Sequence, residues 1–255
     1  MRTSGRKAKL KEKTMEEKYT PLLGEAFHIH TKRCGHASGE DREYIEKTIE
    51  LGAPRIVFTD HAPFPGNPFR NRMMIEELTE YVKTFRRLKE EYAGKIEIMI
   101  GLECEYLPGF HSYYEELKGK SELDLLILGQ HFYEKSDGTY NFADSDRTGE
   151  YQGICEAVVS GIETGLFAVA AHPDRGFKRE KEFPESGEQE CREIIQAASE
   201  KNVWLEQNYA SICRKRNYRP EFWALVPKDA KLLYGIDAHS VAELEKGWKY
   251  KYSEE

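Results

Sequence analysis

Histidine is the residue type whose placement in this 255-residue chain points most directly to chemistry. Six of the eight histidines lie at or within one residue of the carboxyl end of a short apolar run, and a glutamate holds the equivalent place in another run. Imidazole nitrogens combined with a few carboxylates form a ligand set that suits Zn, Mn or Fe. The residues in question are His28, His30, His61, Glu103, His131, His172, Asp237 and His239. The pattern predicts a metal site assembled from several strand ends.

Two of these strand ends carry pairs of candidate ligands two residues apart. Because side chains alternate along a strand, His28 and His30 project from the same face, where one cation could bind both. Asp237 and His239 have the same spacing. One such pair alone is weak evidence, so the prediction depends on its repetition. His111 departs from the pattern, since it lies in a Pro-Gly-Phe-His-Ser segment, and we expect it to be a surface histidine.

The elements that must position these residues alternate short apolar runs with longer amphipathic stretches. The runs are rich in Val, Ile, Leu and Phe with little polar alternation, as expected of strands covered on both faces. The predicted strands are 26–30, 55–60, 96–103, 123–131, 167–172, 203–208 and 231–237. The predicted helices are 40–51, with Ser38 and Asp41 as a capping box, then 73–92, 150–164, 188–201 and a short helix from Ser240 to residue 246.

Alternation of strand and helix repeated seven times predicts a parallel sheet. Seven or eight such units in ~235 residues suit a closed (β/α) barrel. An open doubly wound sheet is the alternative, but no glycine-rich phosphate loop follows any strand. In a barrel the carboxyl ends of the strands converge on one mouth, where active sites are built. The candidate ligands would therefore meet there.

Composition indicates a globular protein without a membrane span. Hydrophobic residues make up 39% and charged residues 33% of the chain, and the longest apolar runs fall far short of the ~18 residues that a bilayer span requires. Five cysteines, an odd number without a Cys-x-x-Cys pair, are typical of reduced thiols. We therefore expect a cytoplasmic protein. Each cysteine is interpreted as a small buried hydrophobe.

Charge is distributed unevenly along the chain. The net charge is −7, which argues against nucleic-acid binding as the main task. Residues 1–19 nevertheless hold seven Lys or Arg and three Glu. We expect residues 1–19 to form a basic, flexible N-terminal tail and residues 20–255 to form a single domain. Alternatively, Met15 is the true start and the first fourteen residues are an extension.

An ordered set of motifs resembles one known family. Phe-His-Ile-His-Thr is followed six residues after its second histidine by His36, then by Thr-Asp-His, Gly-Leu-Glu, Gln-His, Ala-His-Pro-Asp and Gly-Ile-Asp-Ala-His. With these motifs, residues 25–245 resemble the PHP (polymerase and histidinol phosphatase) family of metal-dependent phosphoesterases, as a histidinol-phosphatase-like member. The resemblance implies an α/β fold, a distorted TIM-like (β/α)7 barrel, with three divalent metal ions (Zn, Mn or Fe) at the C-terminal mouth of the strands.

Carried over position by position, the resemblance implies three ligand sets. These are His28, His30, Glu103 and Asp237; Glu103, His131 and His172, with Glu103 bridging; and His36, His61 and His239. Amidohydrolase barrels also begin with His-x-His, but they typically bridge their metals with a lysine at the end of the fourth strand. This chain has Gln130-His131 there, while its third strand supplies a glutamate. The PHP interpretation is therefore preferred.

The implied activity is that of a phosphoric monoester hydrolase acting on a small phosphorylated substrate, with L-histidinol phosphate as first candidate. Clustered dications generate hydroxide near neutral pH and align its attack on phosphorus, so no covalent phosphoenzyme is expected. Asp60, Asp174 and Asp237 are candidates for acid, base or support of the ligands. Arg175 and Arg147 are the first choices for binding the phosphate, because guanidinium groups bind it in bidentate fashion.

Three further features bear on the substrate and the site. Gly129-Gln130-His131 stands where histidinol phosphatases often have Ser-Val-His, and Gly235 precedes Ile236-Asp237 where serine is common, so another small phosphomonoester stays open. On the sixth strand, Glu206 and Asn208 share a face, and either one orients a histidine or the substrate, or both pack in the core. The mouth loops 61–72, 174–181 and 211–219 are rich in basic residues and would select the substrate.

Two other functions were weighed against the phosphomonoesterase. The first is a PHP-type phosphodiesterase or nuclease acting on nucleotides or nucleic-acid ends, which the net charge and the lack of basic segments with interleaved aromatics disfavour. The second is a metal-binding scaffold without catalysis, which the complete ligand set disfavours. The sequence carries no prediction of oligomeric state.

Overall fold

Residues 19–253 are described by a computed structural model, in which seven parallel strands form one sheet in sequence order. The strands are β1 (Ala26–Ile29), β2 (Arg55–His61), β3 (Glu97–Cys104), β4 (Leu125–Leu128), β5 (Val169–Ala170), β6 (Trp204–Asn208) and β7 (Leu232–Gly235). Each strand pairs in parallel with the next. Ile29 also forms a parallel bridge with Ala238, so the segment after β7 returns to β1. The sheet is therefore a nearly closed barrel.

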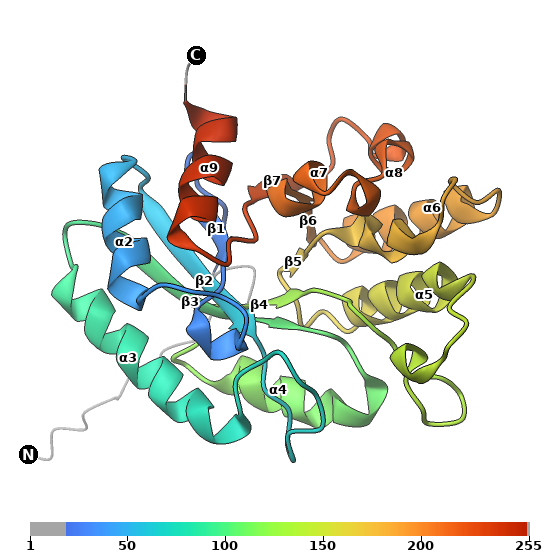
Figure 1. The fold of residues 1–255 in the computed structure, drawn as a ribbon, viewed down its shortest axis with the longest axis horizontal. Helices are drawn as coiled ribbons and strands as arrows, with labels where there is room; N and C mark the ends of the chain where they lie inside the picture. Colours follow the sequence, from blue (N-terminus) through green and yellow to red (C-terminus); the bar gives the residue numbers. More distant parts are fainter. Residues whose placement is uncertain (1–18, 254–255) are drawn as a thin grey trace, which may run out of the picture.

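Helices surround the strands on the outside (Figure 1). The α-helices of the described residues are α2 (Asp41–Glu50), α3 (Leu78–Glu91), α4 (His111–Gly119), α5 (Glu150–Glu163), α6 (Gly187–Glu200), α7 (Tyr209–Cys213), α8 (Pro220–Leu225) and α9 (Val241–Tyr252). Short 3-10 turns complete the loops, namely η1 (Lys32–Cys34), η2 (Ile75–Glu77), η3 (Pro108–Phe110), η4 (Asn141–Ala143), η5 (Pro173–Arg179) and η6 (Lys215–Asn217). Within residues 19–253, no helix has the length and hydropathy that a bilayer span requires.

The core divides into two apolar layers. One lies between the sheet and the helices and includes Phe58 and Phe85, whose ring centroids are 4.3 Å apart. The other fills the inside of the barrel and includes Phe27, Val57 and Tyr19. The Tyr19 ring stacks on Phe27 with 5.6 Å between centroids. The barrel interior is therefore packed with side chains below the mouth, as in other small parallel barrels.

Several boundaries differ from the predicted ones. The capping box of α2 uses Glu40 and Glu43, with the Glu40 N–H donating to the Glu43 carboxylate at 2.7 Å, so the predicted box of Ser38 and Asp41 was wrong. Asp41 instead accepts two hydrogen bonds from Arg33. The final helix continues to Tyr252 rather than ending at residue 246.

Other segments depart from the prediction in element type or length. The fourth and fifth strands are shorter than predicted, because the chain leaves the ladder before the polar residues at its carboxyl end. His111 begins α4 instead of lying in a loop, although it is a surface residue as predicted. The predicted basic tail lies outside the described residues except for Tyr19, which is buried in the barrel.

Candidate metal centre

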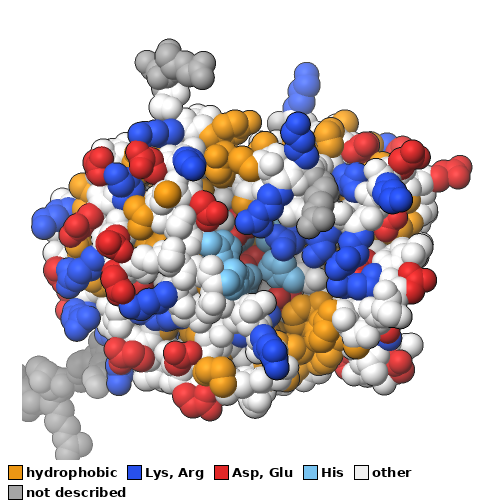
Figure 2. All heavy atoms as spheres, in the orientation of Figure 1, with side chains coloured by type: hydrophobic (Ala, Val, Ile, Leu, Met, Phe, Trp, Pro, Cys, Tyr) orange, Lys and Arg blue, Asp and Glu red, His pale blue; other side chains and the backbone are white. Residues whose placement is uncertain are grey.

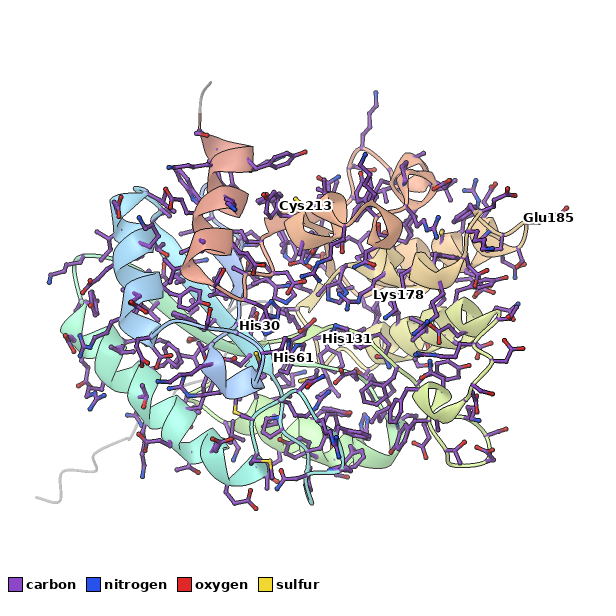
Figure 3. All side chains as sticks on the ribbon, viewed as in Figure 1. His30, His61, His131, Lys178, Glu185 and Cys213 are labelled. Carbon is purple, nitrogen blue, oxygen red and sulfur yellow. The ribbon has the colours of Figure 1, made fainter. Side chains whose placement is uncertain are left out.

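The carboxyl ends of the strands place the predicted ligands around one hollow. In Figure 2 the histidine side chains gather at the centre of the face viewed, and in Figure 3 the labelled His30, His61 and His131 lie close together over the strand ends. His36, from the loop after η1, joins them with its ring centroid 4.6 Å from that of His239. Residues that are up to about 200 positions apart in the chain therefore form one cluster.

The Glu103 carboxylate lies at the middle of this cluster. It ends β3 and is almost completely buried. Imidazole nitrogens surround it at 2.9 to 3.7 Å from its two oxygens; they belong to His28, His30, His61, His131 and His172. Burial raises the pKa of Glu103, but His131, His61 and the other imidazoles outweigh this and hold the pKa well below its usual range. Glu103 is therefore ionised and positioned as a bridging ligand would be.

Asp237 supplies a second carboxylate on the other side of the histidine pair. Its Oδ1 lies 3.3 Å from Nε2 of His30, 3.8 Å from Nε2 of His28 and 3.6 Å from Nδ1 of His239. Burial raises the pKa of Asp237, but His28 and the other imidazoles outweigh it and bring the pKa well below its usual range. Asp237 thus faces the same space as the His-x-His pair.

The neighbouring imidazoles differ in protonation. Burial, together with the nearby His61 and His239 rings, lowers the pKa of His30 well below its usual value. Burial also lowers the pKa of His36 and of His239. Neutral imidazoles carry the lone pair that a metal requires. At His28 burial opposes the charged form, but Glu206, Glu103 and Asp237 raise its pKa well above the usual value.

The backbone is strained at three of the candidate ligands. His28, His172 and Asp237 have φ angles of 68°, 35° and 56°. In the described residues the other non-glycine positions with positive φ are all asparagines, which tolerate this region. Strained backbone of this kind costs about 1–3 kcal/mol per residue and concentrates at functional sites. The positive φ angles turn these three side chains, which lie at the ends of strands, toward the hollow.

Among the candidate ligands of the described residues, three groups have ligand atoms within 4.8 Å of one another. One is His36, His61 and His239, the third set expected from the resemblance. Another is His28, His30 and Glu103, part of the first set. The remaining group consists of His61, Glu103 and His131, so His61 stands in the place expected for His172. His172, expected with Glu103 and His131, contacts Glu103 directly through Nε2 at 2.9 Å.

Buried polar atoms without a hydrogen-bond partner mark the same place. They include Nε2 of His28, both ring nitrogens of His30, Oε2 of Glu103 and Nε2 of His239. Each such atom costs about 1–3 kcal/mol when it has no partner. A divalent cation would satisfy several of them at once, and nitrogen with carboxylate oxygen is a donor set that Zn, Mn and Fe accept. The residues present therefore fit divalent metal ions.

Glu206 supports this cluster from beneath. Its carboxylate is completely buried, and Oε1 lies 2.7 Å from Nδ1 of His28. Its Oε2 accepts hydrogen bonds from the backbone N–H of His172 and from the Asn208 amide, both at 3.0 Å. A carboxylate on Nδ1 fixes the tautomer in which Nε2 carries the lone pair. Of the two residues proposed from the sequence to orient a histidine, Glu206 makes the contact and Asn208 holds Glu206.

Two glycines make room for the buried carboxylates. A Cβ atom at Gly129 would lie 1.9 Å from Oε1 of Glu103, and one at Gly235 would lie 1.6 Å from Oε1 of Glu206. Any larger side chain would displace the carboxylate. Gly129 and Gly235 are therefore sterically coupled to the buried carboxylates of Glu103 and Glu206.

Glu105 and Arg72 were not predicted as site residues. Glu105 is buried and lies 2.9 Å from Nδ1 of His131, while Arg72 donates to both of its oxygens at 2.9 and 3.2 Å. Burial raises the pKa of Glu105, but Arg72 outweighs it and holds the pKa well below the usual range. Glu105 directly follows β3, and its spacing of two residues from Glu103 is the signal that would have found it.

The predicted catalytic aspartates face the protein rather than the hollow. Asp60 is completely buried and accepts hydrogen bonds from the N–H and hydroxyl of Thr31, both at 2.8 Å. Asp174 accepts from the Arg219 N–H at 2.8 Å and from the Trp223 indole at 3.0 Å. Burial raises the pKa of each carboxyl to about 6. Both therefore hold loops at the mouth.

The two predicted phosphate-binding arginines lie in different surroundings. Arg175, at the start of η5, lines the hollow, and its Nε is buried without a hydrogen-bond partner. Arg147 donates to Glu150 of α5. It is not among the described residues that line the hollow. The structure therefore brings Arg175, but not Arg147, to the candidate centre.

The hollow is a cavity of about 700 Å³ with chemically distinct walls. Five candidate ligands line it, namely His36, His61, His131, Asp237 and His239. Arg70, Arg175 and Arg214 are basic residues of the same lining. An apolar wall consists of Pro68, Phe69, Phe132 and Phe142. Figure 2 shows Lys and Arg side chains and an apolar patch on different sides of the histidines. The cavity has room for a small molecule with an anionic group and an apolar part.

Fold and ligand cluster together define a class of protein, a TIM-like barrel with a multi-histidine metal centre at its mouth. A family model described as PHP domain matches residues 26–210, well over half of the chain. The chain therefore belongs to the PHP domain family, and the family prediction from the sequence motifs is confirmed.

Curated relatives of this chain are named as histidinol-phosphatases. The histidinol-phosphatase of Bacillus subtilis is 27% identical over 262 residues, covering 88% of this chain and 96% of that protein. The probable histidinol-phosphatase of Deinococcus radiodurans is 30% identical over 155 residues, covering 58% of this chain and 59% of that protein, less than two thirds of its length. These names agree with the predicted enzyme class, a phosphoric monoester hydrolase.

Solved structures agree with the barrel. A crystal structure from Listeria monocytogenes matches with a TM-score of 0.73 and 20% identity, covering 90% of this chain and 100% of that chain. Histidinol phosphate phosphatase from Lactococcus lactis, in complex with Zn, L-histidinol and phosphate, matches with a TM-score of 0.66 and 20% identity, covering 90% and 94%. The predicted fold, a distorted (β/α)7 barrel, is confirmed.

Proposed function

We propose that this chain is a metal-dependent phosphatase that hydrolyses a small phosphomonoester, with L-histidinol phosphate as the first candidate. The observation that carries the proposal is the buried Glu103 carboxylate, which imidazoles surround. Two of these imidazoles, of His61 and His131, line a cavity that has arginines in its wall. The names of the curated relatives support the substrate, as does the complex of the Lactococcus lactis protein with Zn, L-histidinol and phosphate.

Three divalent ions, Zn, Mn or Fe, would bind in this centre. The ligand sets we propose are His28, His30, Glu103 and Asp237; Glu103, His131 and His172; and His36, His61 and His239. When bound, such ions lower the pKa of a water molecule and offset the negative charge of phosphate oxygens. The protein's own contribution is to lower the pKa of the Glu103 and Asp237 carboxyls, which favours their ionised form. It also lowers the pKa of the His30, His36, His131 and His239 imidazoles, mainly through burial, which favours their neutral form.

Arg175 would bind the phosphate group. Its guanidinium lines the cavity, and its Nε is buried without a partner, so a phosphate oxygen would satisfy a donor that is otherwise unpaired. Guanidinium and phosphate pair in bidentate geometry, which fixes orientation as well as position. Arg147 is less suited to this role because it is already bonded to Glu150.

The rest of the substrate would lie against the apolar wall. Phe69, Phe132 and Phe142 present ring surface to the cavity, and flat rings pack favourably against aromatic side chains. Glu243 lines the same cavity, and one of its carboxylate oxygens accepts a hydrogen bond from the backbone N–H of His239. A ring-bearing, amine-containing alcohol such as histidinol would match this combination of surfaces.

Asp60 and Asp174 would act as positioning residues. Asp60 holds Thr31, which directly follows the His-x-His pair, and Asp174 holds the start of α8 against η5, which carries Arg175. Neither carboxyl lies on the cavity surface, so the proton for the leaving alcohol would come from solvent in the cavity.

The test is a substrate comparison on protein freed of metal and reloaded with Zn, Mn or Fe. Phosphate release from L-histidinol phosphate would be measured beside a panel of nucleotides and bis(p-nitrophenyl) phosphate. We expect hydrolysis of the monoester, its loss in Glu103→Gln, and its retention in the matched variant His111→Ala, which alters an exposed histidine that does not line the cavity. Preference for the diester, or full activity of Glu103→Gln, would overturn the proposal.

A further inference from the structure

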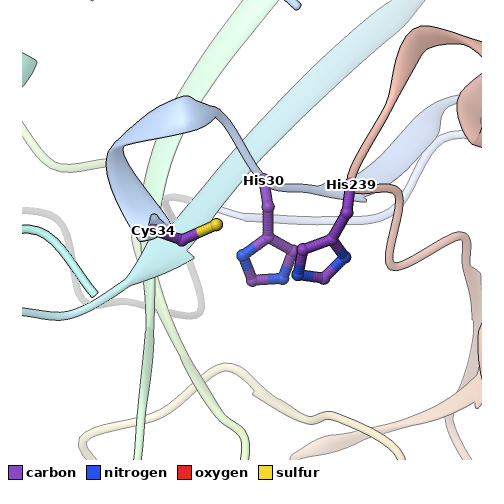
Figure 4. Close-up of side chains that lie close together, drawn as sticks. All are labelled: His30, Cys34 and His239. Carbon is purple, nitrogen blue, oxygen red and sulfur yellow. The ribbon is translucent and has the colours of Figure 1, made fainter. Parts of the chain in front are cut away.

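Cys34 ends η1 beside the candidate metal centre and is completely buried. Its Sγ and one ring nitrogen each of His30 and His239 all lie within 4.8 Å of one another. Figure 4 shows the sulfur directed toward the His30 ring, with the His239 ring stacked on the other side. The two rings are 4.2 Å apart between centroids. Among the cysteines of the described residues, Cys34 is the one whose sulfur lies within 4.8 Å of histidine ring nitrogens in such a three-residue group.

The histidines beside Cys34 have ligand atoms to spare. His30 is completely buried, and neither of its ring nitrogens has a hydrogen-bond partner. Metal-binding histidines normally donate their second ring nitrogen to a carbonyl or a carboxylate, but Nδ1 of His30 faces Cys34 instead (Figure 4). Nε2 of His239 is also buried without a partner. Unsatisfied nitrogen atoms of two stacked imidazoles beside a thiol are an arrangement that a cation would stabilise.

The ligand chemistry identifies the kind of cation. One sulfur and two imidazole nitrogens form a soft set, which binds Zn²⁺, Cd²⁺ and Co²⁺ well and hard ions such as Mn²⁺ or Mg²⁺ poorly. The sets proposed above for phosphate hydrolysis contain nitrogen and oxygen only. Cys34 therefore adds a preference that the other ligands do not have.

We propose that Cys34, His30 and His239 form a binding site for a thiophilic divalent cation at the edge of the metal centre. When the ion binds, the thiol loses its proton to water and a sulfur–metal bond forms. The ion would enter through the cavity, which His239 lines.

The two histidines of this site also belong to the ligand sets proposed for hydrolysis. An ion on Cys34 therefore competes with the ions that use His30 and His239, so thiophilic metals in excess would inhibit hydrolysis. This consequence rests on the proposed function, whereas the site itself does not.

The experiment uses the full chain carrying Cys213→Ser, which removes an exposed thiol. After metal removal, the protein is titrated with Cd²⁺ alone and with Co²⁺ alone, and the thiolate-to-metal absorption in the ultraviolet is recorded. We expect this absorption to saturate with one thiolate per chain. It should disappear with the further change Cys34→Ser and persist with the matched change Cys104→Ser, which alters another buried thiol at a strand end.

Two outcomes would overturn the proposal. One is the absence of thiolate absorption in the Cys213→Ser protein, and the other is unchanged absorption after Cys34→Ser. X-ray absorption of Zn²⁺-loaded Cys213→Ser protein gives a second readout, which does not depend on the folding of Cys34→Ser. A sulfur neighbour at ~2.3 Å from zinc is expected, and its absence would equally overturn the site.

Inhibition of hydrolysis separates this proposal from the proposed function. If the chain hydrolyses L-histidinol phosphate, the Cd²⁺ concentration for half-inhibition should rise at least about tenfold in Cys34→Ser, as expected when a metal site loses an essential supporting group. If no hydrolysis is found, the absorption measurements still decide whether the thiophilic site exists.

Discussion

The Glu206 carboxylate lies 2.7 Å from Nδ1 of His28 and is completely buried. This contact directs the opposite nitrogen of His28 toward Glu103 and Asp237. Replacing Glu206 by Gln keeps the size of the side chain but adds an N–H₂ group where only acceptors fit, because the His172 N–H and the Asn208 amide also donate to Glu206. We expect Glu206→Gln to weaken metal binding by about 10–100-fold.

Competition with a chelator of known affinity would measure this change. Glu97→Gln, at the exposed beginning of β3, is the matched control and should bind metal as the parent does. Equal metal affinities of Glu206→Gln and the parent would contradict the orienting role.

Gly235 should not tolerate even a methyl group. Because its Cβ would lie 1.6 Å from Oε1 of Glu206, Gly235→Ala must displace a buried carboxylate. We expect a loss of about 1–3 kcal/mol in the free energy of unfolding, with a loss of metal affinity as well. Urea denaturation measures the first effect. Gly119→Ala is the control, since nothing lies within 4 Å of its added Cβ, and a similar loss there would contradict the steric explanation.

Replacing only one partner of the buried ion pair between Arg72 and Glu105 should lower the free energy of unfolding markedly. Arg72 also lies over the rings of Phe64 and Phe69, at 5.3 and 5.6 Å from their centroids. Arg72→Met leaves Glu105 buried with a lost partner, and we expect a destabilisation of about 3–5 kcal/mol. Arg192→Met, which breaks an exposed pair with Glu188 on α6, should cost less than about 1 kcal/mol. Urea denaturation measures both changes, and equal losses of stability in Arg72→Met and Arg192→Met would contradict the importance of burial for this pair.

Lys178 should make the free energy of unfolding depend on pH between about pH 8 and 10.5. Burial, with help from Arg175, lowers its pKa from 10.5 to about 8. Between pH 8 and 10.5 the unfolded chain therefore binds more protons at this residue than the folded chain does, so its contribution to stability rises with pH. The unfavourable contribution is complete below pH 8.

Lys178→Gln removes this effect. The difference in free energy of unfolding between parent and Lys178→Gln should shift in favour of the parent from pH 7.5 to 9.5. Lys181→Gln, at an exposed neighbouring position, controls for the general effect of charge removal. A difference that stays constant with pH would contradict the lowered pKa.

Arg175 should contribute to substrate affinity more than Arg147 does. A charge-assisted hydrogen bond contributes about 1.5–3 kcal/mol, so Arg175→Met should raise KM for L-histidinol phosphate by about 10–100-fold. Arg147→Met removes a partner of Glu150 and should leave KM close to that of the parent. Steady-state kinetics of the two variants decide between them, and a larger effect at Arg147 would reverse the assignment.

The barrel and the family could be predicted from the sequence because both depend on local patterns. The strand Arg55–His61, for example, has the apolar run Ile56–Phe58 and ends in Thr-Asp-His. Glycine or asparagine closely follows α2, α3, α5 and α6. The candidate ligands at strand ends could be predicted in the same way, whereas His36 was expected only from the family resemblance. The carboxyl ends of the strands converge in a parallel barrel whatever the conformation of the loops. The proximity of residues at these ends can therefore be predicted without knowing the loop structures.

The partners of buried side chains could not be predicted in this way. Asp60 bonds to Thr31 and Asp174 to Trp223, although both aspartates adjoin candidate ligands in the sequence. Which neighbour a carboxylate contacts depends on the path of a loop and on backbone angles such as the positive φ of Asp237. The same holds for Arg72, which reaches Glu105 from a loop that the sequence marks only as basic.

The candidate ligands lie at graded depths below the cavity surface. His28 and His30 are wholly inaccessible, the side chain of His239 is 17% exposed, and His36 is open to solvent. Tyr19 and Phe27 belong to the packed interior of the barrel, whereas His36, His61 and His239 line the cavity. A chelator should therefore strip the outermost position first, and the ion nearest His28 should be the last to depart and the first to be installed.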